Sequence, residues 1–266
     1  MKIGVVGCGG RMGRMLVQTI LNTDGVSLAG GTERPGHELL GRDIAALTGG
    51  PASGCPIEAD PDALFEGSDV VIDFTSPSTT ALHARLAARH GTALVVGTTG
   101  LGSEQSESLS AAAEVVPVVV AANMSVGVNL LLGLTRQVAA ILGEDYDIEV
   151  VEMHHRHKVD APSGTALALG QAAAAGRGTS LDSVSQRVRD GQIGSRRSGT
   201  IGFATLRGGD VVGEHTVMFA GDGERIELTH RATSRINFAQ GAFRAARWTM
   251  GRPPGLYSMR QVLRLE

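Results

Sequence analysis

Residues 2–13 read KIGVVGCGGRMG, an apolar run followed at once by a glycine-rich turn and the start of a helical pattern. In a strand–turn–helix unit the first glycine, Gly7, allows a tight turn, and Gly9 lets the backbone approach a pyrophosphate. Gly13 then permits close packing of the helix on the strand, and the helix N-terminus offers its N–H groups to phosphate. This stretch therefore predicts a dinucleotide-binding βα unit.

An acidic residue stands where such a unit holds a ribose. Glu33 lies about 20 residues beyond the glycine loop, where its carboxylate can accept hydrogen bonds from ribose hydroxyls. A carboxylate there repels a 2′-phosphate and favours NADH, whereas the adjacent Arg34 can attract that phosphate or stack on adenine. NADH and NADPH are therefore both expected cofactors.

Further β-branched or apolar runs follow at residues 26–31, 69–74, 93–97 and 115–122, separated by helical or loop stretches. Several are apolar throughout, as expected for strands buried on both faces of a parallel sheet. The alternation predicts an α/β fold, with a Rossmann-like doubly wound parallel sheet.

Two loops follow strands of this predicted sheet, at the edge where ligands bind in open α/β folds. They are Gly97-Thr98-Thr99-Gly100 and Ala121-Ala122-Asn123-Met124. Each is consistent either with ordinary turn chemistry or with a ligand contact. Residues 73–77 are instead expected to be structural, with Ser76 as a helix N-cap and Pro77 in the first helical position.

The pattern changes in the second half of the chain. Strands are expected at 147–157, 200–207, 210–220 and 224–232, the last two joined by a short glycine-containing hairpin loop. Helices are expected at 123–142, 163–175 and 237–249, followed by a last short helical turn. Residues 176–198 are polar and rich in glycine and arginine, which predicts a long mobile loop.

Composition narrows the class of protein. In 266 residues, 42% are hydrophobic and 19% are charged, which predicts a folded core. A net charge of −3 and 3% aromatic residues argue against a nucleic-acid-binding surface. The two cysteines, Cys8 and Cys55, form no disulfide framework, and the longest apolar run, 115–122, is too short to span a membrane. With no secretory-like N-terminus, a soluble cytoplasmic protein without membrane or nucleic-acid partners is expected.

The scarcity of lysine points to one position. Of 24 basic residues, all but Lys2 and Lys158 are arginine. Codon bias explains the general excess of arginine but not the persistence of lysine at 158. Because arginine stays protonated while lysine can release a proton, Lys158 is a candidate proton donor.

Lys158 lies in the densest polar segment, residues 152–165, which read EMHHRHKVDAPSGT. Its positive potential suits a small substrate with several negative charges, and clustered cations favour proton exchange near neutral pH. Pro162-Ser163-Gly164-Thr165 then begins a helix whose N–H groups and threonine hydroxyl can bind a carboxylate. Two other interpretations are a solvated basic strand end and a metal site on His155 and His157. The interleaved cations disfavour a divalent ion, so no metal is expected.

Five segments together resemble the 4-hydroxy-tetrahydrodipicolinate reductase family of bacterial and plant lysine and diaminopimelate biosynthesis. They are the Gly7–Gly13 loop, Glu33-Arg34, GTTG at 97–100, AANMSVGVN at 121–129 and HHRHKVDAPSGTA at 154–166. The resemblance runs essentially end to end. One departure is Met124, where many members carry Phe; methionine is soft enough to make a similar contact.

The resemblance implies roles for individual residues. His154 and Lys158 become the proton donors, and His155, Gly164 and Thr165 bind the carboxylates of a small dicarboxylate substrate. The implied cofactor-binding residues are Gly7, Cys8, Gly9, Gly10, Arg11, Met12, Glu33, Arg34, Gly97, Thr98, Thr99, Ala121, Ala122, Asn123 and Met124. Cys8 is expected to be a small packing residue of this loop rather than a thiol nucleophile.

The resemblance also implies a domain plan and a reaction. A dinucleotide-binding domain comprises 1–124 and 235–266, and an inserted α+β domain, 125–234, carries a mostly antiparallel or mixed open sheet and builds a homotetramer. Hydride from NADH or NADPH reduces the unsaturated cyclic imine formed after loss of the 4-hydroxyl, giving tetrahydrodipicolinate. Two alternatives remain: another Rossmann reductase, such as an aspartate- or homoserine-dehydrogenase-like enzyme, and a nicotinamide-nucleotide sensor without turnover.

Overall fold

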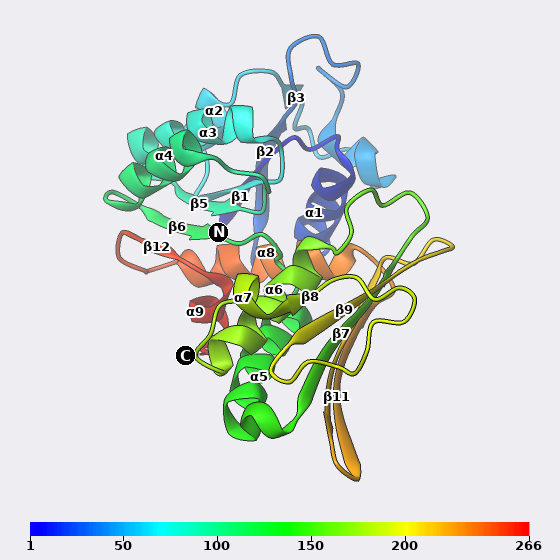
Figure 1. The fold of residues 1–266 in the computed structure, drawn as a ribbon. Helices are drawn as coiled ribbons and strands as arrows, with labels where there is room; N and C mark the ends of the chain where they lie inside the picture. The colour runs from blue at the N-terminus through cyan, green and yellow to red at the C-terminus, as the bar shows by residue number, and fades with distance from the viewer. Residues whose placement is uncertain (266) are drawn as a thin grey trace. The chain divides into compact units, whose positions relative to one another are not determined.

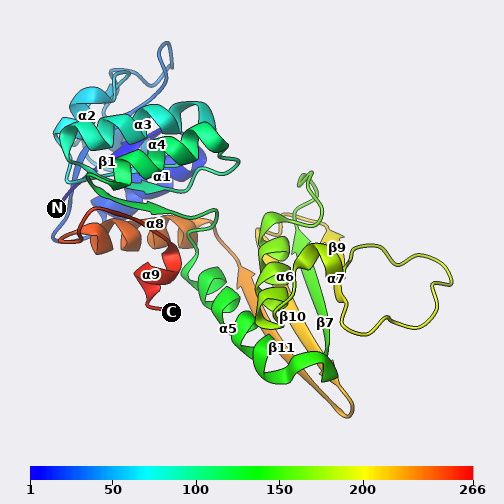
Figure 2. The same cartoon turned by 60° about the vertical axis from the view of Figure 1, so that its left-hand side comes forward.

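The computed structural model describes residues 1–265, which divide into two compact units (Figures 1 and 2). Residues 1–126 and 235–264 form the first unit, and residues 127–234 form the second. The chain therefore leaves the first unit once and returns to it for its last helices.

The first unit is built on a seven-stranded parallel sheet with the order β12-β6-β5-β4-β1-β2-β3. Its strands are β1 (Lys2–Val6), β2 (Ser27–Thr32), β3 (Ile57–Glu58), β4 (Val70–Asp73), β5 (Ala93–Val96), β6 (Pro117–Val120) and β12 (Gly255–Tyr257). Its helices are α1 (Arg11–Leu21), α2 (Asp62–Glu66), α3 (Pro77–His90), α4 (Ser103–Ala113), α8 (Ile236–Thr249) and α9 (Met259–Leu263), with a 3-10 helix over Ile44–Thr48.

Alternate residues of each strand are buried on opposite faces of this sheet. This explains why the strands are apolar throughout. Ile72 of β4 and Val95 of β5 belong to the core shared with α1 and α8. Their neighbours Val71 and Leu94 belong to the core under α3 and α4 (Figure 2). The predicted doubly wound α/β fold is confirmed. Ser76 does occupy the N-cap position of α3 with Pro77 in the first turn, but its side chain makes no capping hydrogen bond.

The second unit carries a five-stranded mixed sheet with the order β11-β10-β7-β9-β8. Its strands are β7 (Asp147–His154), β8 (Ser185–Gln186), β9 (Ile201–Arg207), β10 (Gly213–Gly221) and β11 (Glu224–Ala232); β10 is antiparallel to β7 and β11, whereas β9 is parallel to β7 and β8. Its helices are α5 (Val126–Leu142), α6 (Gly164–Gly176) and α7 (Leu181–Val184), with a 3-10 turn over Gly143–Asp145.

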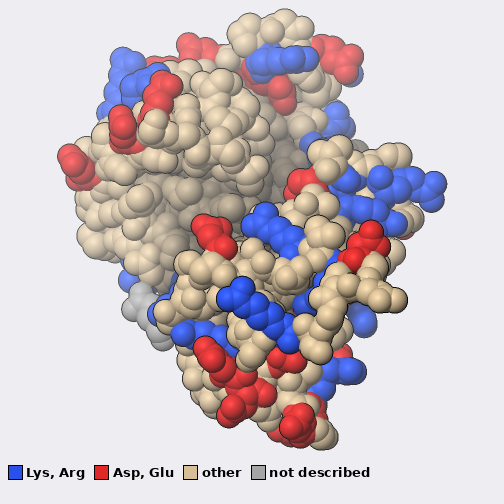
Figure 3. Space-filling model, in the orientation of Figure 1, with Lys and Arg blue, Asp and Glu red and all other residues tan. Residues whose placement is uncertain are grey.

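Helices cover one face of this sheet (Figure 2). Val150 of β7, Phe203 of β9 and Phe219 of β10 pack there against Leu131 of α5 and Leu169 of α6. Over the side shown in Figure 3, acidic and basic side chains of the second unit are interspersed. The predicted open sheet of mixed direction is thus confirmed.

Helix α5 bears on the expectation that no segment is long and apolar enough to span a membrane. Residues 126–145 are long and apolar enough, by length and composition alone, to cross a membrane, although the longest uninterrupted apolar run was expected to be too short. Leu131, Thr135 and Ala139 of this helix are buried, and Leu131 and Ala139 contribute to the core of the second unit. A core helix that packs on a sheet can meet this criterion of length and apolar composition.

The predicted 176–198 loop is shorter than expected. Leu181, which is 7% exposed, packs against α6 near Gly170, so residues 181–184 form a helical turn and β8 follows directly. From there the chain makes a wide arc, which begins and ends close to the sheet (Figure 2).

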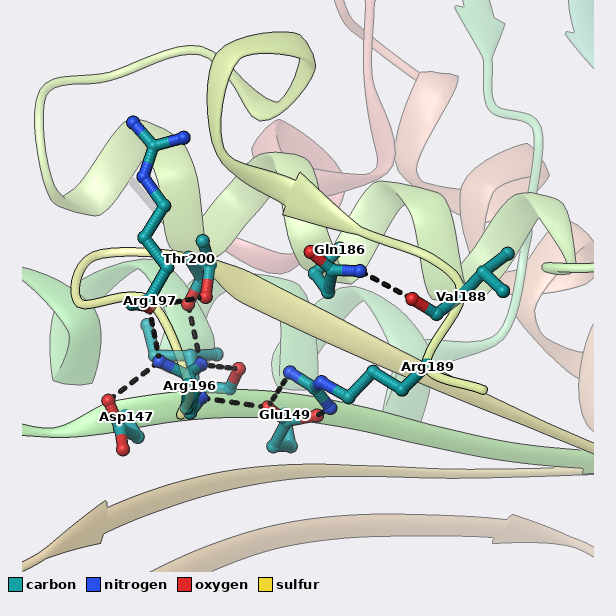
Figure 4. A network of polar contacts seen from close by, with 9 residues as sticks. Asp147, Glu149, Gln186, Val188, Arg189, Arg196, Arg197 and Thr200 are labelled. Atoms are coloured by element: carbon teal, nitrogen blue, oxygen red, sulfur yellow. Dashed lines mark hydrogen bonds and ion pairs between the residues drawn. The ribbon is translucent and has the colours of Figure 1, made fainter. Parts of the chain in front are cut away.

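Arginines fasten both ends of that arc to β7 (Figure 4). Arg189 donates two hydrogen bonds to the Glu149 carboxylate, at 2.6 and 2.7 Å. Arg196 bonds Asp147, Glu149 and the carbonyl groups of Ile148 and Thr200. These contacts hold the loop ends although the sequence pattern indicated only mobility.

The tight packing at Gly13 gives the first prediction. A Cβ atom at this position would lie 2.2 Å from the Gly7 carbonyl oxygen and 2.6 Å from the Cys8 Cα, both in the backbone. Gly13→Ala should therefore destabilise the first unit by about 1–3 kcal/mol. Urea unfolding followed by fluorescence measures this, because the chain's single tryptophan, Trp248, lies in α8 of that unit.

Gly50→Ala is the matched control, since its nearest neighbour would be a side-chain oxygen at 3.5 Å. Its unfolding midpoint should match that of the unsubstituted chain. Equal midpoints for both variants would contradict the steric argument.

Candidate functional site

The glycine loop of the first unit has the geometry of a phosphate site. Gly7 adopts φ +67°, and its N–H donates to the Thr32 carbonyl at 2.8 Å, which closes the turn. Helix α1 begins at Arg11 with no side-chain cap and no acidic residue in its first turn. Among residues 1–265, the N–H groups of Arg11, Met12 and Gly13 have no acceptor. Three N–H donors at a helix N-terminus fit a pyrophosphate.

Glu33 is held against this loop. Its Oε1 accepts a hydrogen bond from the Gly9 N–H at 2.9 Å, and its Oε2 accepts one from the Arg34 N–H at 3.2 Å. The carboxylate thus lies beside the second glycine, while Arg34 is exposed. Cys8 is fully buried, and burial together with the nearby Glu33 raises the pKa of its thiol to about 12. A thiol that stays protonated acts as a packing group.

A cavity of about 330 Å³ lies at the carboxyl ends of β1, β4 and β6, all within the first unit. Its walls are Arg11, Met12, Phe74, Ala122, Asn123, Met124, Arg235 and Phe238. Five of these, Arg11, Met12 and residues 122–124, are predicted cofactor residues that the fold brings together. Phe74, Arg235 and Phe238 were missed by the sequence analysis.

The sequence offers different signals for these three missed residues. Phe74 directly follows β4 just as Gly97 directly follows β5, so its position along the chain could have identified it. Arg235 and Phe238 lie about 110 residues beyond Met124, at the start of α8, and no local motif marks them. Only the packing of α8 against the sheet places them here.

The Gly97–Gly100 loop is anchored from below by a buried carboxylate. Asp73, which is fully buried, accepts hydrogen bonds from Thr75, from Thr80, from His83 at 2.9 Å and from Thr98 at 3.1 Å. Burial raises the pKa of Asp73, but hydrogen bonds from His83 and Thr75 outweigh burial, so the pKa lies below its ordinary value. The Thr98 hydroxyl is therefore committed to the interior, whereas Thr99 is exposed to solvent.

In the second unit, the site is assembled around the end of β7. His154 is the last residue of this strand, and its Nδ1 contacts the carboxylate of Glu152, two residues earlier on the same face. Glu152 also accepts hydrogen bonds from Arg207 Nη2 at 2.9 Å and from the Ser163 N–H at 3.1 Å. One buried carboxylate thus joins the imidazole to the residue that precedes α6.

Lys158 lies on the loop between β7 and α6. Its Nζ is 2.7 Å from the Asp160 carboxylate, its N–H donates to the His155 carbonyl at 3.1 Å, and its side chain is 22% exposed. The Lys158 ammonium lowers the pKa of Asp160, which stays ionised at neutral pH. The Lys158 ammonium is close enough to lower the pKa of His154, so this end of the sheet carries two groups that are chemically able to donate protons.

The N-terminus of α6 completes this site. The Ser163 hydroxyl accepts a hydrogen bond from the Ala166 N–H, and a Cβ atom added at Gly164 would meet nothing within 4 Å. Nδ1 of His155 is buried without a hydrogen-bond partner among the described residues. Open space at a helix N-terminus suits an anionic ligand, and the His155 imidazole on the loop after β7 is a further candidate donor.

His215 of β10 is a further member that the sequence analysis missed. Its ring lies 5.1 Å from that of His154, and its Nε2 is 3.2 Å from the Ser163 hydroxyl. Burial, with a smaller effect of His154, lowers the pKa of His215 from its ordinary 6.5 to about 4. Ligand atoms of Glu152, His154 and His215 lie within 4.8 Å of one another, but Glu152 is already occupied by Arg207, Ser163 and His154. Glu152 thus bonds His154 directly, and Ser163 connects this pair to His215.

Comparison with known proteins bears on the whole chain. The family model for the N-terminus of dihydrodipicolinate reductase matches residues 1–124, and the model for its C-terminus matches residues 127–263. The chain belongs to the dihydrodipicolinate reductase family. The resemblance seen in the sequence is thereby confirmed.

Individual relatives agree. The 4-hydroxy-tetrahydrodipicolinate reductase of Roseobacter denitrificans is 54% identical over 266 residues, which cover 100% of this chain and 98% of the relative. That of Magnetococcus marinus is 53% identical over 98% of each chain. The solved dipicolinate-bound reductase from Paenisporosarcina sp. TG-14 shares the fold, with a TM-score of 0.76 at 24% identity over 97% of each chain.

Membership settles the class of activity. The chain is an NAD(P)H-dependent oxidoreductase, the 4-hydroxy-tetrahydrodipicolinate reductase of diaminopimelate and lysine biosynthesis. The predicted enzyme class and cofactors are confirmed, and the two alternatives, a different Rossmann reductase and a non-catalytic sensor, are not supported.

The low pKa of His215 predicts acid sensitivity in the second unit. Between pH 6.5 and about 4 the unfolded chain binds a proton at this imidazole and the folded chain does not, so stability falls as the pH falls through that range. The loss is at most about 3 kcal/mol. His215→Gln should reduce this dependence, measured by hydrogen exchange of the β7 and β10 amides at pH 5 and 7 and corrected for intrinsic exchange rates.

His157→Gln provides the control, because His157 is exposed in the same unit. It should leave the pH dependence unchanged. A His215 variant that loses as much protection at pH 5 as the unsubstituted chain would show that other groups cause the acid sensitivity.

Proposed function

We propose that the two units divide the reaction between them. Residues 1–124 and 235–266 bind the dinucleotide, and residues 125–234 bind a small dicarboxylate and donate the proton. The observation that carries this proposal is the Glu152 carboxylate, which bonds both His154 and the Ser163 N–H. It places an acid–base group next to the start of a helix that can bind an anion.

The first unit would hold NADH or NADPH through the predicted residues. The N–H groups of Arg11, Met12 and Gly13 face the pyrophosphate, and Glu33 and Arg34 take the adenosine ribose. The remaining contacts are assigned to Gly7, Cys8, Gly9 and Gly10 at the phosphates and to Gly97, Thr98, Thr99, Ala121, Ala122, Asn123 and Met124 at the nicotinamide half. Because the Thr98 side chain bonds Asp73, that loop contributes through its backbone and Thr99.

The second unit would bind the substrate by its two carboxylates. The N–H groups of Gly164 and Thr165 and the Thr165 hydroxyl take one carboxylate at the N-terminus of α6. His155, on the loop after β7, takes the other. The Paenisporosarcina enzyme was solved with dipicolinate bound, which supports a ligand with two carboxylates.

Reduction adds a hydride and a proton across a carbon–carbon double bond. The bound nicotinamide supplies the hydride to the unsaturated cyclic imine that remains after loss of the 4-hydroxyl group. His154 and Lys158 supply the proton, each held by a carboxylate, Glu152 and Asp160 respectively. The cationic groups around them, which include Arg207, also favour the dianionic substrate.

We also propose that the protein is a homotetramer in the cytoplasm. The family resemblance supports this assembly through the sheet of the second unit. Two cysteines without a disulfide between them agree with a reducing compartment. Size-exclusion chromatography with light scattering tests the tetramer.

A coupled assay tests the reaction. Dihydrodipicolinate synthase generates the unstable substrate, and oxidation of NADH or NADPH is followed by absorbance. Turnover that requires the synthase product supports the proposal. Turnover with an aspartate- or homoserine-pathway substrate instead, or cofactor binding without turnover, would refute it.

Lys158→Arg should separate charge from proton donation. Arginine keeps the positive charge and the contact with Asp160 but cannot release a proton, so kcat should fall by about 10²–10⁴-fold. KM for the substrate should change far less. The control is Lys2→Arg, the same substitution at the other lysine, which starts β1 on the surface. An Lys158 variant with the turnover of the control would remove Lys158 from the mechanism.

Thr165→Val tests the substrate anchor. Valine keeps the volume and branching of threonine but lacks the hydroxyl, so pyridine-2,6-dicarboxylate should bind more weakly by about 1–3 kcal/mol. NADH affinity should hardly change, because the cofactor contacts lie in the first unit. Calorimetric titrations with each ligand measure both. If dicarboxylate affinity held while NADH affinity fell, the anion site would have to be reassigned.

A further inference from the structure

Glu152 is the most buried ionisable group of the second-unit site, with 1% of its surface exposed. Its three hydrogen-bond donors come from different parts of the unit. Arg207 Nη2 belongs to β9, the Ser163 N–H precedes α6, and His154 Nδ1 ends β7. A charge buried this deeply is stable only while all its partners are in place.

We infer that Glu152 is a positioning residue for the reductase reaction, which acts by orienting His154 and the N-terminus of α6. This inference rests on the proposed function, in which His154 donates a proton and α6 binds a substrate carboxylate. Glu152 itself touches neither substrate nor cofactor in this scheme.

Strand geometry makes the pairing with His154 obligatory. Residues two apart on a β-strand project to the same face, and β7 alternates regularly between buried and partly buried residues. Glu152 and His154 therefore meet by register alone. Because an ionised carboxylate can only accept, the imidazole must carry its proton on Nδ1 when neutral. That tautomer leaves Nε2 as the atom that exchanges a proton with substrate, and among residues 1–265 Nε2 has no hydrogen-bond partner.

The same carboxylate also affects the pKa of His154. The titratable and charged groups around this imidazole are Glu152 on β7, Lys158 on the following loop, Arg207 on β9 and His215 on β10. Burial lowers the pKa of His154 most strongly, and Lys158 and Arg207 lower it further, whereas Glu152 raises it. The pKa of His154 lies below its ordinary value, and Glu152 is the neighbour that opposes this lowering.

Arg207 extends this control to the second proton donor. Its Nη2 bonds both Glu152, at 2.9 Å, and the Asp160 carbonyl, at 2.6 Å. Asp160 in turn holds the Lys158 ammonium. One buried carboxylate therefore fixes the loop that carries Lys158 as well as the imidazole.

Glu152→Gln tests the inference, since glutamine keeps the shape but removes the charge. Proton donation needs the imidazolium form, which is lost as the pH rises through the pKa of His154. The alkaline limb of the kcat profile should therefore move to lower pH by about one unit. KM for NADH should stay unchanged. NMR titration of the histidine rings in the free protein should show the same downward shift for His154, independently of turnover.

Glu149→Gln is the matched control. Glu149 lies on the other face of β7, and its carboxylate also pairs with arginines, Arg189 and Arg196. Losing those ion pairs tests for a general effect of a broken salt bridge on this strand. Neither the His154 titration nor the kcat profile should move in this variant.

Glu152→Asp guards against a variant that fails to fold. Aspartate keeps the charge on a shorter side chain, so kcat should fall through the changed geometry while the alkaline limb stays near its original pH. A Glu152→Gln protein with the His154 titration and the pH profile of Glu149→Gln would overturn the inference, as would an alkaline limb displaced equally in Glu152→Asp. If the His154 titration moved but the kcat profile did not, the assignment of His154 as proton donor in the proposed function would fall instead.

Discussion

Burying a carboxylate is costly unless several donors surround it, and both units use this requirement to organise their loops. In the first unit Asp73 ends β4 and gathers Thr75, Thr80, His83 and Thr98. In the second, Glu152 gathers donors from two strands and from the start of α6. Each carboxylate is almost inaccessible to solvent, so its partners cannot be exchanged for water without unfolding the surroundings.

The consequence is a division between fixed and available groups. The hydroxyl of Thr98 and Nδ1 of His154 are hydrogen-bonded to the buried carboxylates. These bonds hold the Gly97–Gly100 loop and the His154 imidazole in place. Among the described residues, the groups left without a hydrogen-bond partner are the Nε2 atom of His154 and the first amides of α1, and the Thr99 side chain is exposed. The candidate ligand-binding groups are therefore held in position by hydrogen bonds to buried carboxylates.

Close packing imposes a second constraint. The Gly13 contact with Gly7 brings α1 against β1 so that the helix N-terminus faces the end of the strand. Gly97 likewise lies against the Phe74 ring, where an added Cβ would be 2.3 Å away. Neither position tolerates a side chain, which explains why both loops are built from glycine and small residues.

Local patterns in the sequence were sufficient to predict most helices and strands and most of the candidate site residues. Apolar runs and the glycine loop predicted the doubly wound sheet, because burial on both faces leaves a continuous apolar signature along each strand. The His-rich segment 152–165 was identified from its composition alone. The extent of loop 176–198 was wrong, because Leu181 is a single apolar residue whose burial against α6 has no local pattern.

Only the tertiary structure decided which distant residues join these motifs. Arg235 and Phe238 line the cavity with Met124, His215 lies beside His154, and Arg207 completes the partners of Glu152. Each of these contacts spans about 50 or more residues of chain, far beyond the periods of 2 and 3.6 residues on which sequence patterns depend. The sequence by itself determined most of the strands and helices and the candidate groups for proton exchange and phosphate binding. The packing of α8 and the pairing of β7 with β9 and β10 determined their neighbours, because burial and hydrogen bonding are satisfied between elements and leave no trace within one.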